Sequence, residues 1–182
     1  MSLVRIVIHW DGGDYQEDSF SRDHYHCTYA GDGDVVPGNC EPEDNISVRN
    51  GIYAAHTYHK NTGSIGVAFN AMKGAVQFKT NGKYPIKKDQ FEAGCKHIAQ
   101  LCRKYKIPVT DKTVLTHAEV QPNLRVKQKG KWDITELPHA GLTGVEECGD
   151  YIRSRIRFYL GKTIPSDRES IRMAWLQKLL KR

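Results

Sequence analysis

The sequence predicts an α/β domain built on a mixed central β-sheet flanked by helices. Short aliphatic, strand-like segments alternate with segments of helical periodicity, and one hairpin pattern interrupts this alternation. With 182 residues, of which 39% are hydrophobic, the chain is long enough to bury one core. We therefore expect a single domain over residues 1–163 and a short C-terminal appendage over residues 164–182.

The first element is a strand in the segment "VRIVIHW", residues 4–10. Its β-branched residues are apolar on both alternating faces, which is typical of a central strand covered on each side. The turn-forming "DGG" follows and ends it. His9 and Trp10 are thus expected at the strand's exit, where α/β sheets commonly place groups that bind ligands.

A hairpin is predicted from "HYHCTYAGDGDVV", because Tyr25, Cys27 and Tyr29 alternate before a Gly-Asp turn. The stretch 38–51 is polar and rich in Pro, Asn and Gly, so we expect a surface loop that borders a cleft.

Three further elements follow. "TGSIGVAFNAM" is expected to be a second buried strand, in which small residues alternate with large ones and allow close backbone approach. "KTVLTHAEV" is expected to be another short strand, again with a histidine at its end. Between them, helical spacing of apolar residues predicts a helix, with Phe91, Cys95, Ile98, Cys102 and Tyr105 on one face.

At the C-terminal end, Thr143 and Glu146 form a capping-box pattern ahead of "VEECGDYIRSRIRFYL", which predicts a helix that covers the sheet. A second such pattern, Ser166 with Glu169, follows Pro165. The segment "IRMAWLQKLLKR" then predicts a short cationic amphipathic helix.

Composition excludes several classes of protein. The five cysteines are odd in number and lack CxxC spacing, which argues against a disulfide scaffold or a zinc ribbon. A net charge of +6 favours acidic partners, but the basic residues are spread along the chain without a nucleic-acid-binding motif, so we expect no specific nucleic acid. The first residues show no secretory pattern, so we expect cytoplasmic synthesis.

Two histidines and one aspartate suggest a metal site. His9 and His117 both leave buried strands, and Asp133 follows in "GKWDIT". Two imidazoles and one carboxylate suit a catalytic zinc ion, which keeps a fourth position for water or substrate. In an extended chain Lys131 and Asp133 share one face while Trp132 packs behind them. A second cation beside a metal is costly unless it meets developing negative charge, so this pattern predicts a hydrolase.

Five segments, in order, resemble the zinc-dependent N-acetylmuramoyl-L-alanine amidases. The segments are "IVIHW", "HYHCTYAGDGDVV", "AAHTYHKNTGSIGVAF", "LTHAEV" and "GKWDIT". This family includes phage endolysins, cytosolic muropeptide-recycling enzymes and the animal peptidoglycan recognition proteins, and the resemblance spans roughly residues 4–160. It implies a mixed sheet with flanking helices and assigns His9, His117 and Asp133 as zinc ligands.

The resemblance also implies roles for other residues. Tyr25 and Lys131 would take part in cleavage of the amide that joins muramic acid to L-alanine, Lys131 by stabilising the oxyanion. Tyr25 or Glu119 would handle a proton, although Glu119 also fits a supporting role behind His117. The substrate groove would be lined by His56 and by the "NTGSIG" stretch with Asn61, Thr62 and Ser64.

One departure from the family narrows the choice among its members. Recycling enzymes carry a catalytic carboxylate on the "SIG" strand, where this chain has Ala68, so the base must lie elsewhere. Alternation in "DHYHC" leaves open that His24 and His26, rather than Tyr25, face the site, or that this cluster binds a separate metal. The segment between His117 and Asp133 is also longer than in many members.

The leading hypothesis is therefore a zinc amidase of phage or prophage origin that acts on peptidoglycan or muropeptides as a monomer. A peptidoglycan-binding module without catalysis and a cytosolic recycling amidase are the alternatives. As an endolysin, the protein would reach the wall after release through a membrane pore. The C-terminal helix would either pack on the domain or attach it to anionic wall polymer or membrane headgroups.

Overall fold

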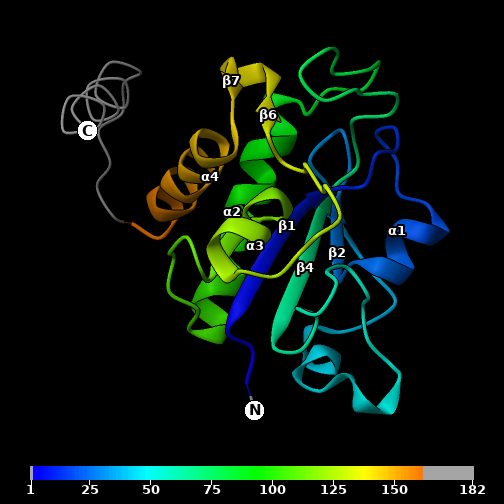
Figure 1. Cartoon of the computed structure of the whole chain (residues 1–182), viewed down its shortest axis with the longest axis vertical. Helices are drawn as coiled ribbons and strands as arrows, with labels where there is room; N and C mark the ends of the chain where they lie inside the picture. Colours follow the sequence, from blue (N-terminus) through cyan, green and yellow to red (C-terminus); the bar gives the residue numbers. More distant parts are fainter. Residues whose placement is uncertain (1, 162–182) are drawn as a thin grey trace.

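The computed structural model describes residues 2–161 and shows one α/β domain around a five-stranded mixed sheet (Figure 1). The strand order is β3-β2-β4-β1-β5. The strands are β1 (Arg5–Trp10), β2 (Cys27–Tyr29), β3 (Val35–Pro37), β4 (Ser64–Phe69) and β5 (Val114–Thr116). This confirms the predicted fold class, while the predicted C-terminal helix lies outside the described residues.

Strand pairing follows the sequence patterns. The apolar strand β1 lies between β4 and β5 and pairs with both in parallel. Strand β2 pairs in parallel with β4 and in antiparallel with β3, which is the predicted hairpin. Because parallel strands end at the same edge of a sheet, the exits of β1, β4 and β5 come together there.

Each face of the sheet carries a different set of helices. Helices α2 (Lys88–Tyr105) and α4 (Val145–Tyr159) pack with the large core cluster that contains Ile6 and Ile8 of β1. The other face buries Val7 with Leu115 and Val120, the last of these in helix α3 (His117–Leu124), which lies in front of β1 in Figure 1. His9 follows the alternation of Val7 and faces this second side.

Two predicted boundaries were wrong. The strand predicted in "KTVLTHAEV" is β5, and it ends at Thr116. The following "HAEV" forms the first turn of α3 because Thr116 and Glu119 make a reciprocal capping box. The capping box expected of Thr143 and Glu146 does not form. Thr143 belongs to the short pair β6 (Glu136–Leu137) and β7 (Leu142–Thr143), and Gly144, with a φ of 124°, precedes α4.

The polar segments contain short helical turns. Helix α1 (Ser19–His24) precedes the hairpin and was not predicted. The expected loop at 38–51 contains two 3-10 turns, η1 (Pro42–Ile46) and η2 (Val48–Asn50), and a third, η3 (Pro138–Ala140), separates β6 from β7.

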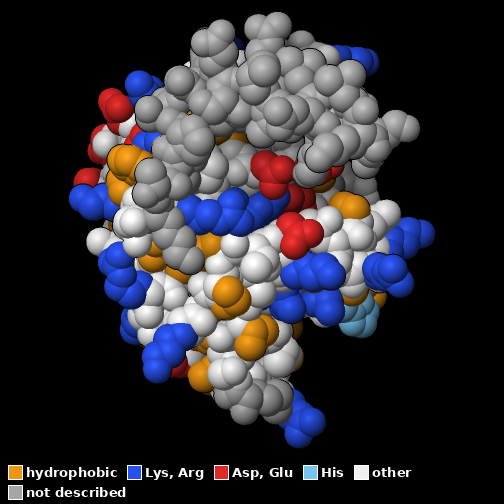
Figure 2. All heavy atoms as spheres, turned by 90° about the vertical axis from the view of Figure 1, so that its left-hand side faces the viewer, with side chains coloured by type: hydrophobic (Ala, Val, Ile, Leu, Met, Phe, Trp, Pro, Cys, Tyr) orange, Lys and Arg blue, Asp and Glu red, His pale blue; other side chains and the backbone are white. Residues whose placement is uncertain are grey.

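The surface and the cysteines agree with the compositional expectations. All five cysteines are free. On the face shown in Figure 2, basic side chains are spread over the surface, some of them side by side, and a few acidic side chains lie among them. Within residues 2–161, the helices are too short or too polar to cross a membrane.

Candidate metal centre and active site

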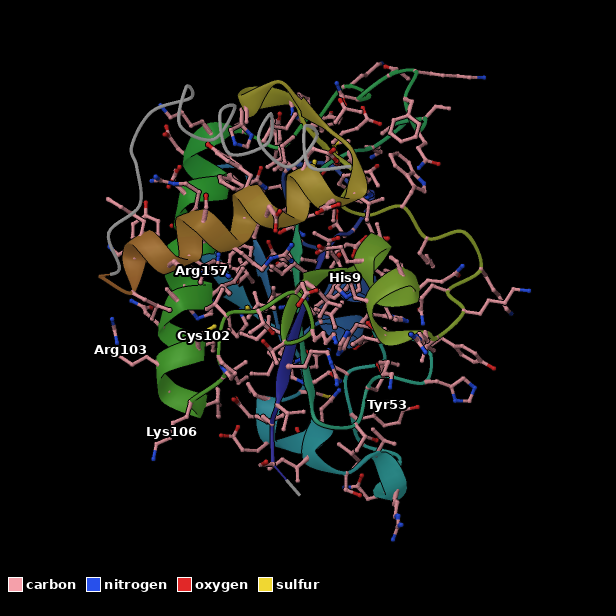
Figure 3. The ribbon with its side chains drawn as sticks, turned by 60° about the vertical axis from the view of Figure 1, so that its left-hand side comes forward. His9, Tyr53, Cys102, Arg103, Lys106 and Arg157 are labelled. Carbon is pink, nitrogen blue, oxygen red and sulfur yellow. The ribbon has the colours of Figure 1, made fainter. Side chains whose placement is uncertain are left out.

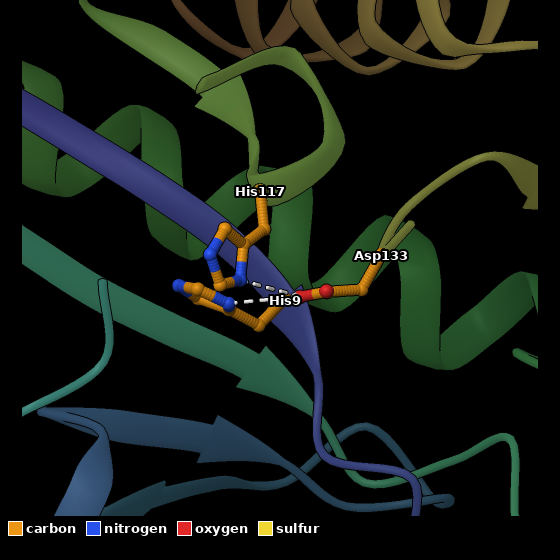
Figure 4. A group of neighbouring side chains, drawn as sticks. All are labelled: His9, His117 and Asp133. Carbon is orange, nitrogen blue, oxygen red and sulfur yellow. Dashed lines mark hydrogen bonds and ion pairs between the residues drawn. The ribbon is translucent and has the colours of Figure 1, made fainter. Parts of the chain in front are cut away.

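His9, His117 and Asp133 come together at the edge where the parallel strands end (Figure 4). Asp133 Oδ2 lies 2.9 Å from His9 Nδ1 and 3.2 Å from His117 Nδ1. All three residues are buried, and their ligand atoms lie within 4.8 Å of one another. Among residues 2–161 this is the one group of three or more such side chains with metal-site spacing.

The His117 ring nitrogen that points away from Asp133, Nε2, is hydrogen-bonded to Gln128. The Gln128 Nε2 donates to the carbonyls of Tyr58 and Val126, at 3.1 and 3.3 Å, which fixes the orientation of the amide. Its Oε1 therefore faces His117 Nε2, 2.9 Å away, and accepts the proton of that nitrogen. The Nδ1 lone pair of His117 is then directed at Asp133.

The outer nitrogen of His9 is held by His56. His56 Nε2 lies 3.4 Å from the carbonyl of Ser64 and donates to it, so His56 Nδ1 is left as an acceptor. The Thr57 hydroxyl lies 2.8 Å from that Nδ1 and donates to it. His9 Nε2, 3.3 Å from His56 Nδ1 and 3.5 Å from Thr57 Oγ1, donates toward this pair, so the Nδ1 of His9 presents a lone pair to Asp133. The ring of His56 lies against Gly66 of β4, where a Cβ atom would come within 2.3 Å of it.

These hydrogen bonds create a site that fits a cation. Two imidazole lone pairs and a carboxylate oxygen converge, and a proton can satisfy one of the two contacts at most. Burial lowers the pKa of His9 to about 4, so its ring is neutral at pH 7. Burial alone would raise the pKa of Asp133, but its close contacts with the His117 and His9 rings outweigh burial and lower that pKa to about 2. Two imidazoles and a carboxylate are a donor set for zinc.

Tyr25 and Lys131 line the same cavity of about 450 Å³ as His56, His117 and Asp133. The ring of Tyr25 lies 5.1 Å from that of His9. Burial raises the pKa of Tyr25 well above its usual range, and the nearby Asp133 carboxylate raises it further, so the hydroxyl stays protonated. Lys131 is exposed at the cavity wall.

Two aromatic residues form the wall behind Lys131. Trp132 packs edge-on against Trp10 with ring centroids 4.8 Å apart, and both side chains line the cavity. The "KWD" spacing predicts Lys131 and Asp133 on one face with Trp132 behind them, whereas all three residues line the cavity and none of them is part of a strand.

Glu119 lies away from the cavity. Its two carboxylate oxygens accept from Arg153 of α4 at 2.8 and 3.0 Å, and one of them also accepts from the backbone of Thr116. Both members of this ion pair are almost fully buried. Glu119 therefore fixes the start of α3, and with it His117, rather than facing a substrate.

The "NTGSIG" stretch also lies outside the cavity lining. Asn61 accepts from the backbone of Thr57, Thr62 is exposed, and Ser64 is buried with its hydroxyl bonded to Arg5 at the start of β1. Of the substrate-binding residues expected from the sequence, the structure places His56 in the cavity wall and the other three around it or beneath it.

The "HYHC" alternation is resolved by the surroundings of each residue. Tyr25 faces His9, His24 is half-buried in the cavity lining, and His26 is buried, where its Nδ1 accepts from the backbone of Gly66. Ala68 pairs in register with His9, so a carboxylate at this position would stand beside the candidate metal ligands.

Sequence reasoning missed Gln128 and Arg153. Both look like ordinary polar residues in charged surroundings, and nothing in their spacing indicates burial. The "THAE" capping box was a local signal that α3 begins at His117. This pattern would have predicted that Glu119 caps α3, but it could not have predicted the ion pair with Arg153, which lies 34 positions away in α4.

A family comparison agrees with this site. Residues 2–136 match the model of the family described as "N-acetylmuramoyl-L-alanine amidase", and the chain belongs to this family of peptidoglycan amidases. A search of curated protein sequences finds no match.

Several solved structures are similar to this chain at low identity, and one of them, with a TM-score above 0.5, shows the same fold. A mutant form of PlyL is 17% identical, with a TM-score of 0.51 and 86% of each chain covered. The amidase LysC from Clostridium intestinale is 16% identical, with a TM-score of 0.43, and the match covers 69% of this chain and 88% of LysC. The Drosophila peptidoglycan recognition protein SD is 21% identical, with a TM-score of 0.43 and coverage of 63% and 69%.

Proposed function

We propose that this protein is a zinc-dependent hydrolase that cleaves the amide bond between N-acetylmuramic acid and L-alanine of peptidoglycan, in the manner of an endolysin. The observation that best supports this proposal is the convergence of two imidazoles and the Asp133 carboxylate at a cavity that Lys131 and Tyr25 also line. A zinc ion held by His9, His117 and Asp133 would supply a Lewis acid that activates water and polarises the amide carbonyl.

The remaining chemistry is assigned to two side chains of the cavity wall. Lys131 carries the positive charge that stabilises the oxyanion formed when the carbonyl carbon becomes tetrahedral. Tyr25 remains protonated and donates a hydrogen bond to the reacting amide. Glu119, bound to Arg153, acts by positioning His117.

Ala68 supports an endolysin-like enzyme over a recycling amidase. Strand β4 offers a methyl group beside His9 where recycling enzymes carry a carboxylate. The proposed reaction accordingly uses no acidic side chain from this strand. Release of the protein to the cell wall after synthesis belongs to the same proposal.

Mass analysis of muropeptides tests the proposal. Zinc-loaded protein should release stem peptides with a free L-alanine amine, and a chelator should stop this release. Full activity of metal-free protein would refute the metal-dependent mechanism. Binding of peptidoglycan without any cleavage by zinc-loaded protein would instead favour a recognition module.

Lys131→Met tests the assignment of the oxyanion group. We expect kcat to fall about 10²–10³-fold while KM and zinc content hardly change, because the charge acts on the transition state. Lys96→Met, on the exposed side of α2, is the matched control and should behave as the wild type. Loss of zinc in Lys131→Met would show a structural role.

A further inference from the structure

A row of exposed cations leads along the chain to Lys131 in the cavity wall. In the segment 125–131, "RVKQKGK", every second residue is basic and exposed, while Gln128 between them is buried. We call Arg125, Lys127 and Lys129 the cationic ridge. Lys131, which continues the row, belongs to the cavity wall.

Gln128, the buried residue between Lys127 and Lys129, connects the cationic ridge to the candidate metal centre. Gln128 binds His117 through its side-chain oxygen and the carbonyl of Tyr58 through its nitrogen. Lys127 and Lys129 are therefore each one residue from a group that contacts a candidate metal ligand. The Lys129 ammonium also lies 5.9 Å from the ring centroid of Tyr58, in the loop that supplies His56.

Two segments near the cavity differ in charge. The ridge and the neighbouring segment 52–60, which includes Lys60, contain no acidic residue. The segment 11–18, "DGGDYQED", contains four acidic residues and no basic one, and one of them, Asp14, pairs with Lys73. Asp11 lines the cavity, and both Asp11 and Asp18 act electrostatically on Tyr25. An anionic ligand in the cavity is thus attracted to the ridge and repelled by Asp11 and Asp18.

We propose that the cationic ridge binds the free carboxylates of the stem peptide, and so orients the substrate with its peptide over residues 125–131. This inference rests on the proposed function, since it concerns the peptide half of the same substrate. The muramic acid half then extends away from the ridge, toward Phe20 and His24, which line the cavity and stack with ring centroids 3.9 Å apart.

The ridge acts through exposed charges, so its effect depends on ionic strength. Such attraction is screened over about 8–10 Å at physiological salt. The dissociation constant for an anionic stem peptide should consequently rise with added salt, whereas that for a fully amidated peptide should change little.

The experiment compares two synthetic ligands on zinc-loaded protein. One is a stem tripeptide with free side-chain and terminal carboxylates, and the other is the same peptide with both amidated. Binding is measured by calorimetry, and cleavage of the corresponding muramoyl peptides is measured in parallel. The ridge variant carries Arg125→Gln, Lys127→Gln and Lys129→Gln.

The control variant removes the same charge from a remote surface. It carries Lys96→Gln, Arg103→Gln and Lys106→Gln on and next to α2. Figure 3 shows Arg103 and Lys106 at the end of α2, pointing away from the region of His9. Melting temperatures establish that both variants are folded.

We expect the wild type and the control variant to bind the free-carboxylate peptide at least about 10-fold more tightly than the diamide at low salt, and the ridge variant to lose most of this preference. Equal binding of the two peptides by the wild type, or an unchanged preference in the ridge variant, would overturn the inference. A ridge variant that lyses whole walls poorly but keeps the peptide preference would show that the ridge binds wall polymer instead. Cleavage of both muramoyl peptides without a carboxylate preference leaves the proposed function intact, whereas failure to cleave either one contradicts it.

Discussion

The two halves of the candidate metal centre are built in different ways. His9 lies on β1, whose backbone is hydrogen-bonded on both sides, and its ring is held through His56 by a backbone carbonyl of β4. His117 is the first residue of α3, and Asp133 follows the loop after this helix. Side chains hold this segment in place: Gln128 binds His117, and Glu119 pairs with Arg153 at the start of α3.

This difference predicts where substitutions will do damage. A sheet tolerates the loss of one side chain because its backbone bonds remain, whereas a segment held by side chains depends on each of them. We therefore expect distant substitutions to disturb the His117–Asp133 half more than the His9 half.

The largest effect should come from Asp133→Ala. It removes the one anion of the site and leaves two imidazoles, so we expect loss of stoichiometric zinc and of amidase activity. Metal analysis and a lysis assay measure both. Asp111→Ala, at an exposed position, serves as the control. Retention of zinc by Asp133→Ala would show that other ligands form the site.

Arg153→Met tests the side-chain support at a distance from the cavity. It leaves the Glu119 carboxylate buried without its partner, which should cost about 3–5 kcal/mol of unfolding free energy and lower the melting temperature by roughly 10 °C.

Arg155→Met is the matched control, since its pair with Glu92 is partly exposed and should contribute about 1 kcal/mol or less. Adding Glu119→Gln to Arg153→Met should restore part of the lost unfolding free energy, because no carboxylate then stays buried without a partner. If the Arg153 and Arg155 variants are equally stable, the Glu119–Arg153 pair does not support α3.

Gln128→Ala should weaken metal binding rather than folding. Without the amide, His117 Nε2 loses its acceptor, and the ring can rotate or change tautomer. We expect zinc affinity to fall about 10–100-fold, as measured by competition with a chromogenic chelator. Gln100→Ala on the exposed side of α2 should leave the affinity unchanged. An unchanged affinity in Gln128→Ala would mean that His117 is oriented by packing alone.

The smallest effect concerns His26, on the sheet side of the centre. Burial lowers the pKa of His26 in the folded chain, so the unfolded chain binds a proton more readily. The stability due to this residue is therefore complete above about pH 6.5 and decreases as the pH falls below it. In urea unfolding of metal-free protein between pH 7.5 and 5, His26→Gln should show a shallower decrease than the wild type. Identical slopes would assign the pH dependence to other groups.

The degree to which the site could be predicted depended on sequence distance. His9 was found because an aliphatic run ends beside a turn, and the "KWD" spacing placed Lys131 and Asp133 together on one wall. The side chains that support them come from elsewhere in the chain: Arg153 in α4 and His56 in the loop before β4. No local pattern indicates such a pairing.

By itself, the sequence determined the α/β class, the positions of the buried strands along the chain, the hairpin and the three candidate ligands. These follow from local periodicity, turn residues and the order of family motifs. The tertiary structure alone decided which nitrogen of each histidine faces Asp133, that Glu119 pairs with Arg153 instead of facing the cavity, and that Asp11 and Lys131 line the same cavity. Hydrogen-bond partners and the sign of the local field depend on groups brought together from distant parts of the chain, and these become neighbours only when the sheet and its helices have packed.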